Sequence, residues 1–486
     1  MSARRAGVAR DLLALVAITV GAIAIHGYHP GIEDAEIYLP GILKALHPGL
    51  FPAHTAFFES HAHLTVFPEL IAASMRVLPW SPGVTLLAWQ AGAIFMLLFA
   101  CWWIGRTVLA SPRAVWAGVL LVGSLLTIPV AGTDLYLMDQ YLTPRSFSAP
   151  LSLLAVACLL DDHPVWAVIG VAAIAPIHPL MVVFAAALLV AVFLARRVGS
   201  AQTAWAVTAP AFFPPVTRAY RRVLATRPSF LLTKWAWYAW IGLAAPFVIF
   251  GGLVRAAKRR GHTTLAALCR AMLIFDGGCL LVALVISVPG PFERFAELQP
   301  MRGLQLVYLV MFLVGGGLIG EHLLGRHPWR WAALFGPICA GMLIAQVQLF
   351  PASRHLELPG LAPENTWVQT FVWVRDHTPR DAYFVLDPGY LSRPGEDEHG
   401  FRAIAERSRL ADAVKDSGVA SMFPDLSTLW AEQVDALDGW TGFTARDFTR
   451  LRQRFGVDWT ITERVVPGLE CVYRNGPLSV CRIPAN

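Results

Sequence analysis

The sequence predicts a polytopic α-helical membrane protein with about eleven transmembrane helices and a small α/β C-terminal domain. Three observations lead to this fold class. Of 486 residues, 56% are hydrophobic and only 15% are charged, whereas a soluble domain carries about 25% charged residues. Apolar runs recur from the N-terminus to about residue 350, and many are long enough to cross a bilayer. After Phe350-Pro351 the chain becomes charged and mixed, over a length that suits a small domain.

A spanning helix needs about 20 mostly apolar residues. The expected spans lie near 11–28, 84–105, 114–131, 147–160, 164–177, 180–196, 199–213, 235–254, 265–288, 303–322 and 332–350. Three of them, at 147–160, 164–177 and 199–213, are short. The basic start before the first apolar run would also fit a cleaved signal peptide. We expect an uncleaved anchor, because further spans follow it.

Clusters of basic residues between the spans set the expected orientation. They lie at Arg4/Arg5/Arg10, Arg106/Arg113, Arg196/Arg197, Arg255/Lys258/Arg259/Arg260 and Arg326/Arg330. All fall on one side, which the positive-inside rule assigns to the cytoplasm together with the N-terminus. This holds only if 64–80 lies along the outer interface instead of crossing.

The expected domains are a transmembrane module, 1–351, and an extracytoplasmic α/β domain, 352–486. Four polar segments then face outward. They are a first loop with interfacial helices, 29–80, a second loop, 132–146, a third loop, 214–234, and the C-terminal domain itself.

Several classes of function lose support from the sequence. The net charge of +6 could suggest nucleic acid, but the cations sit in short clusters between apolar segments, so no nucleic-acid partner is expected. The sequence contains no G-x-x-x-x-G-K-[ST] and no H-E-x-x-H, which argues against nucleotide-driven transport and zincin proteolysis. A secondary transporter would show corresponding broken helices in two halves, and the sequence has no such symmetry.

Acidic residues follow two of the spans directly. Glu33 and Asp34 begin the first loop, and Asp134 begins the second. Carboxylates at this depth can reach the head group of a lipid-borne substrate, deprotonate an acceptor hydroxyl or hold a divalent cation against a phosphate. The alternative is a solvated loop start, in which Glu33 or Asp34 caps the following helix.

Cations also collect on the expected outer side, against the positive-inside trend. Arg145 lies in the second loop, His178 lies between the fifth and sixth spans, and Arg302 begins the tenth. Recognition of a phosphate is one cause, since guanidinium groups match phosphate geometry. Binding to anionic lipid head groups is the other.

The first loop also contains a small metal-binding pattern. His61 and His63 lie two residues apart beside Glu59, and such a set could bind zinc or manganese. The pattern is common, and ordinary polar loop residues explain it more simply.

The C-terminal domain reads as alternating helices and strands. TWVQTFVWVRDHTPRDAYFVLDP predicts a helix, a turn and a strand, and FRAIAERSRLADAVKDSG predicts a loop leading to a helix. FGVDWTITER predicts another strand, and ECVYRNGPLSVCRI a hairpin that turns at Asn475-Gly476. Cys471 and Cys481 flank this hairpin and could form a disulfide outside the cytoplasm; two buried thiols are the alternative.

Several of these segments carry a resemblance. EDAEIYLPGILKALHPGLFP, AGTDLYLMDQYLTPRS, IHPLM, ELQPMRGLQL and FRAIAERSRLADAVKDSG are similar to an uncharacterised bacterial family of GT-C-like membrane proteins. More broadly, the order of span, acidic first loop, second acidic position and outer C-terminal domain resembles the GT-C superfamily of membrane glycosyltransferases.

The resemblance implies an inverting transferase at the outer face of the bacterial inner membrane. It would move a sugar from a polyprenyl-phosphate donor to a glycan, lipid or protein acceptor. Apart from the resemblance, the carboxylates of the first loop allow a divalent cation, magnesium or manganese, as a cofactor. Asp34 matches the catalytic carboxylate of the family's first loop, Glu33 is its neighbour, and Asp134 matches the second acid. His178 and Arg302 match positions near the lipid phosphate, although lysine is frequent where His178 stands. The alternative is a non-enzymatic member that binds a lipid or a protein partner.

Overall fold

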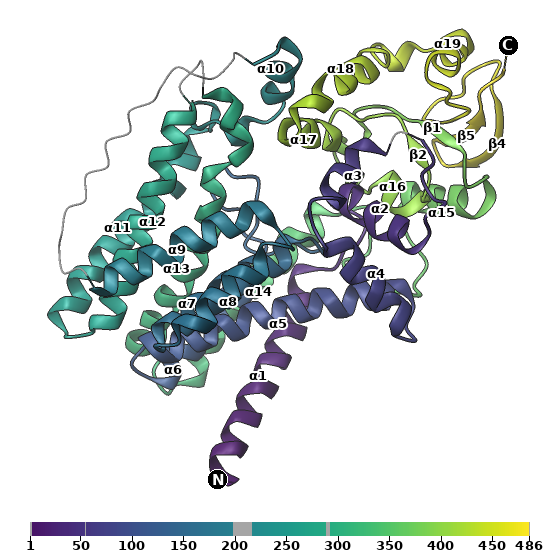
Figure 1. Ribbon diagram of the computed structural model, residues 1–486. Coiled ribbons are helices and arrows are strands. Elements are labelled where there is room, and N and C mark those ends of the chain that lie inside the picture. Colours follow the sequence, from purple (N-terminus) through teal and green to yellow (C-terminus); the bar gives the residue numbers. More distant parts are fainter. Residues whose placement is uncertain (1, 54, 198–215, 288–291, 486) are drawn as a thin grey trace.

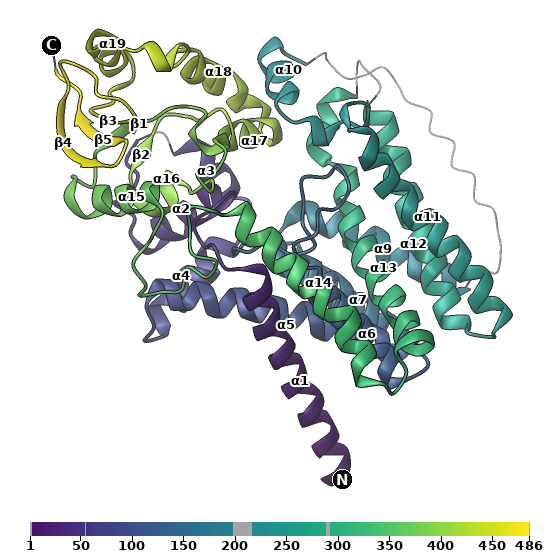
Figure 2. The same cartoon turned by 180° about the vertical axis from the view of Figure 1, so that it is seen from behind.

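The computed structural model describes residues 2–53, 55–197, 216–287 and 292–485. A bundle of helices forms one part of the molecule, and a smaller part with a β-sheet lies beside it, away from the N-terminus of α1 (Figures 1 and 2). The bundle consists of α1 Ser2–His26, α5 Pro82–Val108, α6 Pro112–Ser124, α7 Arg145–Leu160, α8 Pro164–Ile174, α9 Pro179–Arg197, α11 Trp237–Arg259, α12 Thr263–Ser287, α13 Leu304–Ile319 and α14 Pro328–Leu349.

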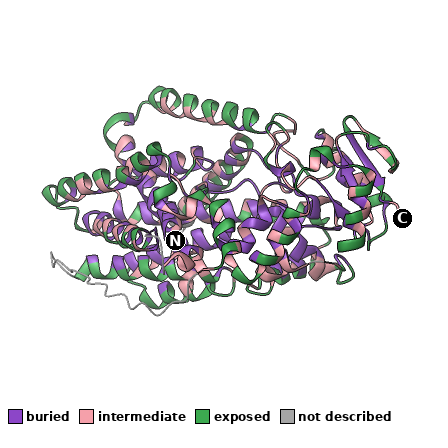
Figure 3. Cartoon of the chain, turned by 90° about the horizontal axis from the view of Figure 1, so that it is seen from above, coloured by how far each residue is buried: buried purple, intermediate pink, exposed green. Residues whose placement is uncertain are grey.

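Seven of the described helices are long and apolar enough to cross a membrane, so the chain is a multi-pass membrane protein. The helices α6, α7 and α8 coincide with expected spans but are too short to cross alone. The expected span at 199–213 lies outside the described residues. Residues coloured as exposed follow the outer helices of the bundle (Figure 3). Many exposed residues are large and apolar, among them Trp166, Val248, Ile344 and Val347. Lipid is a natural neighbour for such a surface.

The expected span 114–131 is wrong in its second half. The helix α6 ends at Ser124, and the chain continues as an irregular segment through Pro129. This segment pairs with the second loop, since Val130 N–H donates to the Leu135 carbonyl at 2.8 Å and Met138 N–H to the Leu126 carbonyl at 2.8 Å. Proline cannot continue the helical hydrogen bonds, so the apolar run past Ser124 supports the second loop instead of spanning.

The C-terminal part is built around a mixed five-stranded sheet. The strand order is β2-β1-β3-β5-β4, in which β1 lies parallel to β2 and β3, and β5 lies antiparallel to β3 and β4. The strands are β1 Tyr383–Val385, β2 Ser408–Arg409, β3 Trp459–Thr462, β4 Glu470–Asn475 and β5 Leu478–Arg482. The helices are α15 Thr366–His377, α16 Phe401–Ala405, α17 Lys415–Met422, α18 Ser427–Asp435 and α19 Ala445–Phe455.

Successive residues of β1 pack on opposite faces of the sheet. Phe384 joins a core with Phe371 of α15, whereas Val385 joins a second core with Phe448 of α19. The sheet is therefore covered on both faces, as in an α/β layer.

The hairpin differs slightly from its prediction. The strand β4 continues through Asn475, and the two-residue turn is Gly476-Pro477, one residue later than expected. Gly476 has a φ of +57°, a conformation that glycine adopts without a Cβ clash. Cys471 and Cys481 lie opposite each other in this hairpin and form a disulfide.

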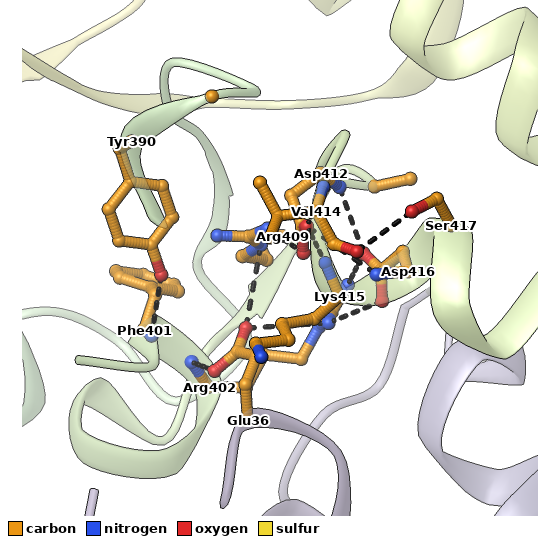
Figure 4. Close-up of polar contacts among 12 residues, drawn as sticks. Glu36, Tyr390, Phe401, Arg402, Arg409, Asp412, Val414, Lys415, Asp416 and Ser417 are labelled. Carbon is orange, nitrogen blue, oxygen red and sulfur yellow. Dashed lines mark hydrogen bonds and ion pairs between the residues drawn. The ribbon is translucent and has the colours of Figure 1, made fainter. Parts of the chain in front are cut away.

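The first loop folds into α2 Ala35–Leu46, α3 Ala56–Ala62 and α4 Phe67–Val77. The C-terminal part docks on it through the fully buried Glu36 of α2. Glu36 accepts the backbone N–H of Arg402 at 2.7 Å and that of Ala403 at 3.3 Å, and its carboxylate faces the guanidinium of Arg409 at 3.6 Å. Arg402 in turn donates to both oxygens of Asp416 at 3.0 and 2.8 Å (Figure 4). A buried polar network thus joins the two ends of the chain.

The third loop holds the other side of α17. It carries α10 Arg218–Ala225, where the Tyr220 hydroxyl donates to the Ser421 carbonyl at 3.1 Å. Arg227 donates to the Val414 carbonyl and to the Ser417 hydroxyl, the latter at 3.1 Å. The helix α17 is therefore fixed between the first and third loops.

Candidate active site

A cavity of about 410 Å³ lies where the first loop, the second loop and α17 meet. Its volume is within the range of small-molecule sites. Both signs of charge line it. The charged and polar lining side chains include Glu33, Asp34, His61, Asp134, Asp139, Arg145, Arg227, Gln299, Arg302, Glu398 and Lys415.

Asp34 occupies a position between two cations. Its Oδ2 lies 3.9 Å from Nη2 of Arg145, and its Oδ1 lies 3.7 Å from Nζ of Lys415. Asp34 immediately precedes α2, yet its side chain makes no capping hydrogen bond. The interpretation of this carboxylate as a helix cap is therefore wrong, and the side chain belongs to the cavity.

Glu33 and Lys415 form a direct ion pair. The Lys415 side chain is only 8% exposed, and this burial lowers its pKa from the usual lysine value. The two adjacent carboxylates, Glu33 and Asp34, act in the opposite direction because they favour the charged ammonium. We therefore treat the pair as ionic near neutral pH.

Arg145 lines the cavity, but its guanidinium is already paired with Asp139. Its Nε and Nη2 donate to one oxygen of Asp139 at 3.2 and 2.7 Å, and both side chains are buried. An arginine held in this way by a carboxylate has a fixed direction. Arg145 can thus position Asp34, but it is not a free phosphate ligand.

Arg302 has a different environment from Arg145. It lies in the short helix η4, Pro300–Gly303, directly before α13, and it lines the cavity. Among the described residues, no hydrogen-bonded or ion-paired partner holds its guanidinium. Arg302 is therefore the cation of this cavity best placed to receive an anionic ligand.

Two histidines lie near these arginines. His61 lines the cavity, and burial lowers its pKa to about 4. His178 is buried outside the cavity lining, and burial followed by nearby Arg302 and Arg145 holds its pKa well below the usual value. Both rings are neutral at pH 7. His178 therefore does not line the cavity and carries no charge at pH 7, unlike the phosphate-binding residue expected at this position.

The side chains of Glu59, His61 and His63 do not meet at one point where a metal ion could bind. Glu59 pairs with Lys44 at 2.6 Å and accepts the Thr55 hydroxyl, while His63 is exposed and His61 is turned to the cavity. Residues two apart on a helix point in different directions, which explains why the two rings separate.

The cavity carboxylates do not fit a divalent ion either, because cationic side chains already lie against them. Within the described residues, no group of three or more His, Cys, Asp or Glu side chains is arranged to hold a metal ion.

Backbone strain also concentrates at the cavity. Nine described non-glycine residues have positive φ, and five of them line it: Glu33, Ala131, Asp134, Gln299 and Glu398, with φ from 42° to 55°. Each such residue costs about 1 to 2 kcal/mol. A strained backbone conformation is retained only where the surrounding structure stabilises it, and such conformations cluster at functional sites.

Lys415 and Glu398, both from the C-terminal part, were not expected in the site. Glu398 lines the cavity, and burial followed by the neighbouring charge of Asp34 raises its pKa to about 7. The backbone N–H of Glu33 donates to the Glu398 carbonyl at 3.2 Å, which ties the two acidic segments together. The only signal for Lys415 in the sequence was the segment FRAIAERSRLADAVKDSG, which pointed to a family and not to a cavity.

No family model matches the chain, and no curated protein matches it. Among solved structures, the chain is similar to the oligosaccharyltransferase of Archaeoglobus fulgidus in its apo form, with a TM-score of 0.46 and 10% identity. It is also similar to the same organism's enzyme tethered through a disulfide to an acceptor peptide containing the NVT sequon, with a TM-score of 0.49 and 12% identity. Each match covers 93% of this chain and 69% of that chain.

Proposed function

We propose that this protein is a membrane glycosyltransferase that moves a sugar from a polyprenyl-phosphate donor to an acceptor hydroxyl. The reaction would take place at the outer face of a bacterial cytoplasmic membrane. One observation carries the proposal: a single cavity gathers the carboxylates of Glu33, Asp34 and Asp134 from two separate loops. The guanidinium of Arg302 lies in the same cavity and has no hydrogen-bonded or ion-paired partner among the residues that the structure describes. Its place beside the membrane helices would let a lipid-borne head group enter while the lipid chain stays in the bilayer.

The proposed step needs a base and a stabilised leaving group. The acceptor oxygen forms a bond to the anomeric carbon from the face opposite the phosphate, and the bond from that carbon to the phosphate oxygen breaks, with inversion. The acceptor proton passes to a carboxylate. The negative charge on the leaving phosphate is met by Arg302.

Asp34 suits the role of base better than Glu33. Glu33 is in direct contact with Lys415, whereas the cations nearest Asp34 lie at 3.7 and 3.9 Å, so its oxygens are freer to accept a proton. In this scheme Asp134 orients the acceptor or the sugar from the other side of the cavity.

The test is a transfer assay in proteoliposomes with a labelled polyprenyl-phosphate sugar, together with the surface glycan profile of the cells. We expect Asp34→Asn to lower transfer by about 10²- to 10⁴-fold, the contribution of a positioned base, and Asp134→Asn to impair it as well. Glu69→Gln is the matched control, because Glu69 is an exposed acid of the same loop. Unchanged transfer and an unchanged glycan profile in both Asp variants would contradict the proposal.

A non-enzymatic role in binding a lipid or a protein partner is the second candidate. It is favoured by the ion pairs that already hold Glu33 and Asp139, as in a site built for stability. On this reading, purified protein binds polyprenyl phosphate equally well before and after Asp34→Asn, and it shows no turnover with any polyprenyl-phosphate sugar.

A further inference from the structure

The most unexpected group in the cavity is the ammonium of Lys415. It comes from the first residue of α17 and pairs with Glu33, 382 positions earlier in the chain. The same Nζ lies 3.7 Å from Asp34. A single cation from the C-terminal part thus lies against both first-loop carboxylates, where a divalent ion would otherwise have to bind.

The surrounding network keeps Lys415 in this position. The Asp412 side chain accepts the backbone N–H of Val414 at 2.6 Å, just before the lysine. Immediately after the lysine, Asp416 holds Arg402, which contacts Glu36 (Figure 4). Since Glu36 lies two residues after Asp34, the backbone that carries the lysine and the backbone that carries the acids are joined by one buried network. The backbone at Lys415 therefore cannot move away from the acids unless that network opens.

Two other cations of the cavity already have partners elsewhere, and Arg302 is not ion-paired with Glu33 or Asp34 in the described part of the chain. Arg145 is bound to Asp139, and Arg227 donates to the N-terminal turn of α17. A divalent ion coordinated by Glu33 and Asp34 would lie within a few ångströms of the Lys415 ammonium, where like charges repel strongly at the low effective dielectric of a buried site.

We infer that Lys415 is the resident cation of the first-loop carboxylates, that it excludes divalent metal from the cavity, and that the site works without a metal ion. Lys415 is a positioning residue in this role, because it holds Glu33 and Asp34 and need not touch the reacting atoms. The last part of the inference rests on the proposed function, whereas the exclusion of metal does not.

The experiment is Mn²⁺ binding to the full-length protein in nanodiscs, followed by electron paramagnetic resonance. Wild type should bind Mn²⁺ weakly, and Lys415→Met should bind it at least about tenfold more tightly. Lys415→Arg keeps the charge and should behave like wild type. Lys44→Met is the matched control, because Lys44 also pairs with a first-loop acid, Glu59, outside the cavity lining. Adding Asp34→Asn to Lys415→Met should remove the gained binding.

Tight Mn²⁺ binding by wild type that is lost in Asp34→Asn would overturn the inference, as would equal Mn²⁺ binding by Lys415→Met and Lys44→Met. If Lys415→Met does not elute as a monodisperse species, Lys415→Gln takes its place, and transfer by unmutated protein in EDTA gives a measurement that needs no variant. Full transfer in EDTA supports the inference, and transfer that depends on added Mg²⁺ or Mn²⁺ refutes it. Absence of transfer under all conditions would count against the proposed function, while the Mn²⁺ titration would still decide the exclusion of metal.

Discussion

Replacing Glu36 with alanine should loosen the C-terminal part from the first loop. The substitution leaves two buried backbone N–H groups, those of Arg402 and Ala403, without their acceptor. It also removes the carboxylate that faces Arg409. Breaking one partner out of a buried charged network costs about 3 to 5 kcal/mol.

The lower end of that range applies here, because the arginines keep other partners. Arg402 still donates to Asp416, and Arg409 still pairs with Asp412. We therefore expect a loss of about 3 kcal/mol in the free energy of local opening, which is roughly a hundredfold in the opening equilibrium. Glu36→Gln retains an acceptor for the two N–H groups but loses the charge, and should cost less, about 1.5 to 3 kcal/mol.

Hydrogen exchange measured by mass spectrometry tests this expectation, because amide exchange reports local opening free energies. Peptides covering 400–422 should exchange roughly a hundredfold faster in Glu36→Ala, while peptides from α5 stay unchanged. Glu69→Ala, which removes an exposed acid from the same loop, should leave both sets within about 0.5 kcal/mol. Equal exchange of 400–422 in Glu36→Ala and Glu69→Ala would refute the argument that Glu36 anchors the C-terminal part.

Three further predictions follow from other parts of the molecule. The pKa of Glu398 is raised to about 7 from 4.5, so between these pH values the folded protein keeps a proton that the unfolded chain loses. The free energy of unfolding should therefore fall by up to about 3 kcal/mol as the pH rises from 4.5 to 7, and in Glu398→Gln the melting temperature should depend less on pH over this range. A Cβ at Gly316 would meet the Ala117 carbonyl at 2.9 Å, whereas one at Gly315 would meet nothing within 4 Å; Gly316→Ala should therefore lower the melting temperature through a cost of about 1 to 3 kcal/mol, and Gly315→Ala should not. Reduction of the hairpin disulfide, which closes a short loop, should destabilise the C-terminal part by about 2 to 3 kcal/mol, seen as earlier melting in dithiothreitol; no shift would show that the bridge is dispensable.

The sequence was most informative where a local pattern has one physical meaning. Long apolar runs predict membrane helices, and the strongest of them coincide with helices in the structure. Ionisable residues at the ends of apolar runs are costly unless they have a use, and this principle selected Asp34, Asp134 and Arg302, which line one cavity. Their roles remain predictions.

The sequence was least informative about partners far along the chain. Nothing local indicates that Lys415 reaches Glu33, 382 positions earlier. A lysine at the start of a polar helix is expected to be solvated. The sequence of α17 alone does not show that the first and third loops cover both of its sides. Likewise, the apolar character of 125–131 predicts a helix, and only its pairing with the second loop, around Pro129, shows otherwise.

The contact between Glu36 and Arg402 joins residues 366 positions apart, and this separation has a consequence for biosynthesis. At synthesis rates of about 5 to 20 residues per second, Glu36 waits roughly 20 to 70 s before its partner exists. During that interval the first loop carries an acid destined for full burial, which must stay hydrated or be shielded by a chaperone. A chain that stops short of Arg402 would never satisfy it. Because Glu398 and Lys415 also line the cavity, the cavity is complete only after most of the chain has been synthesised.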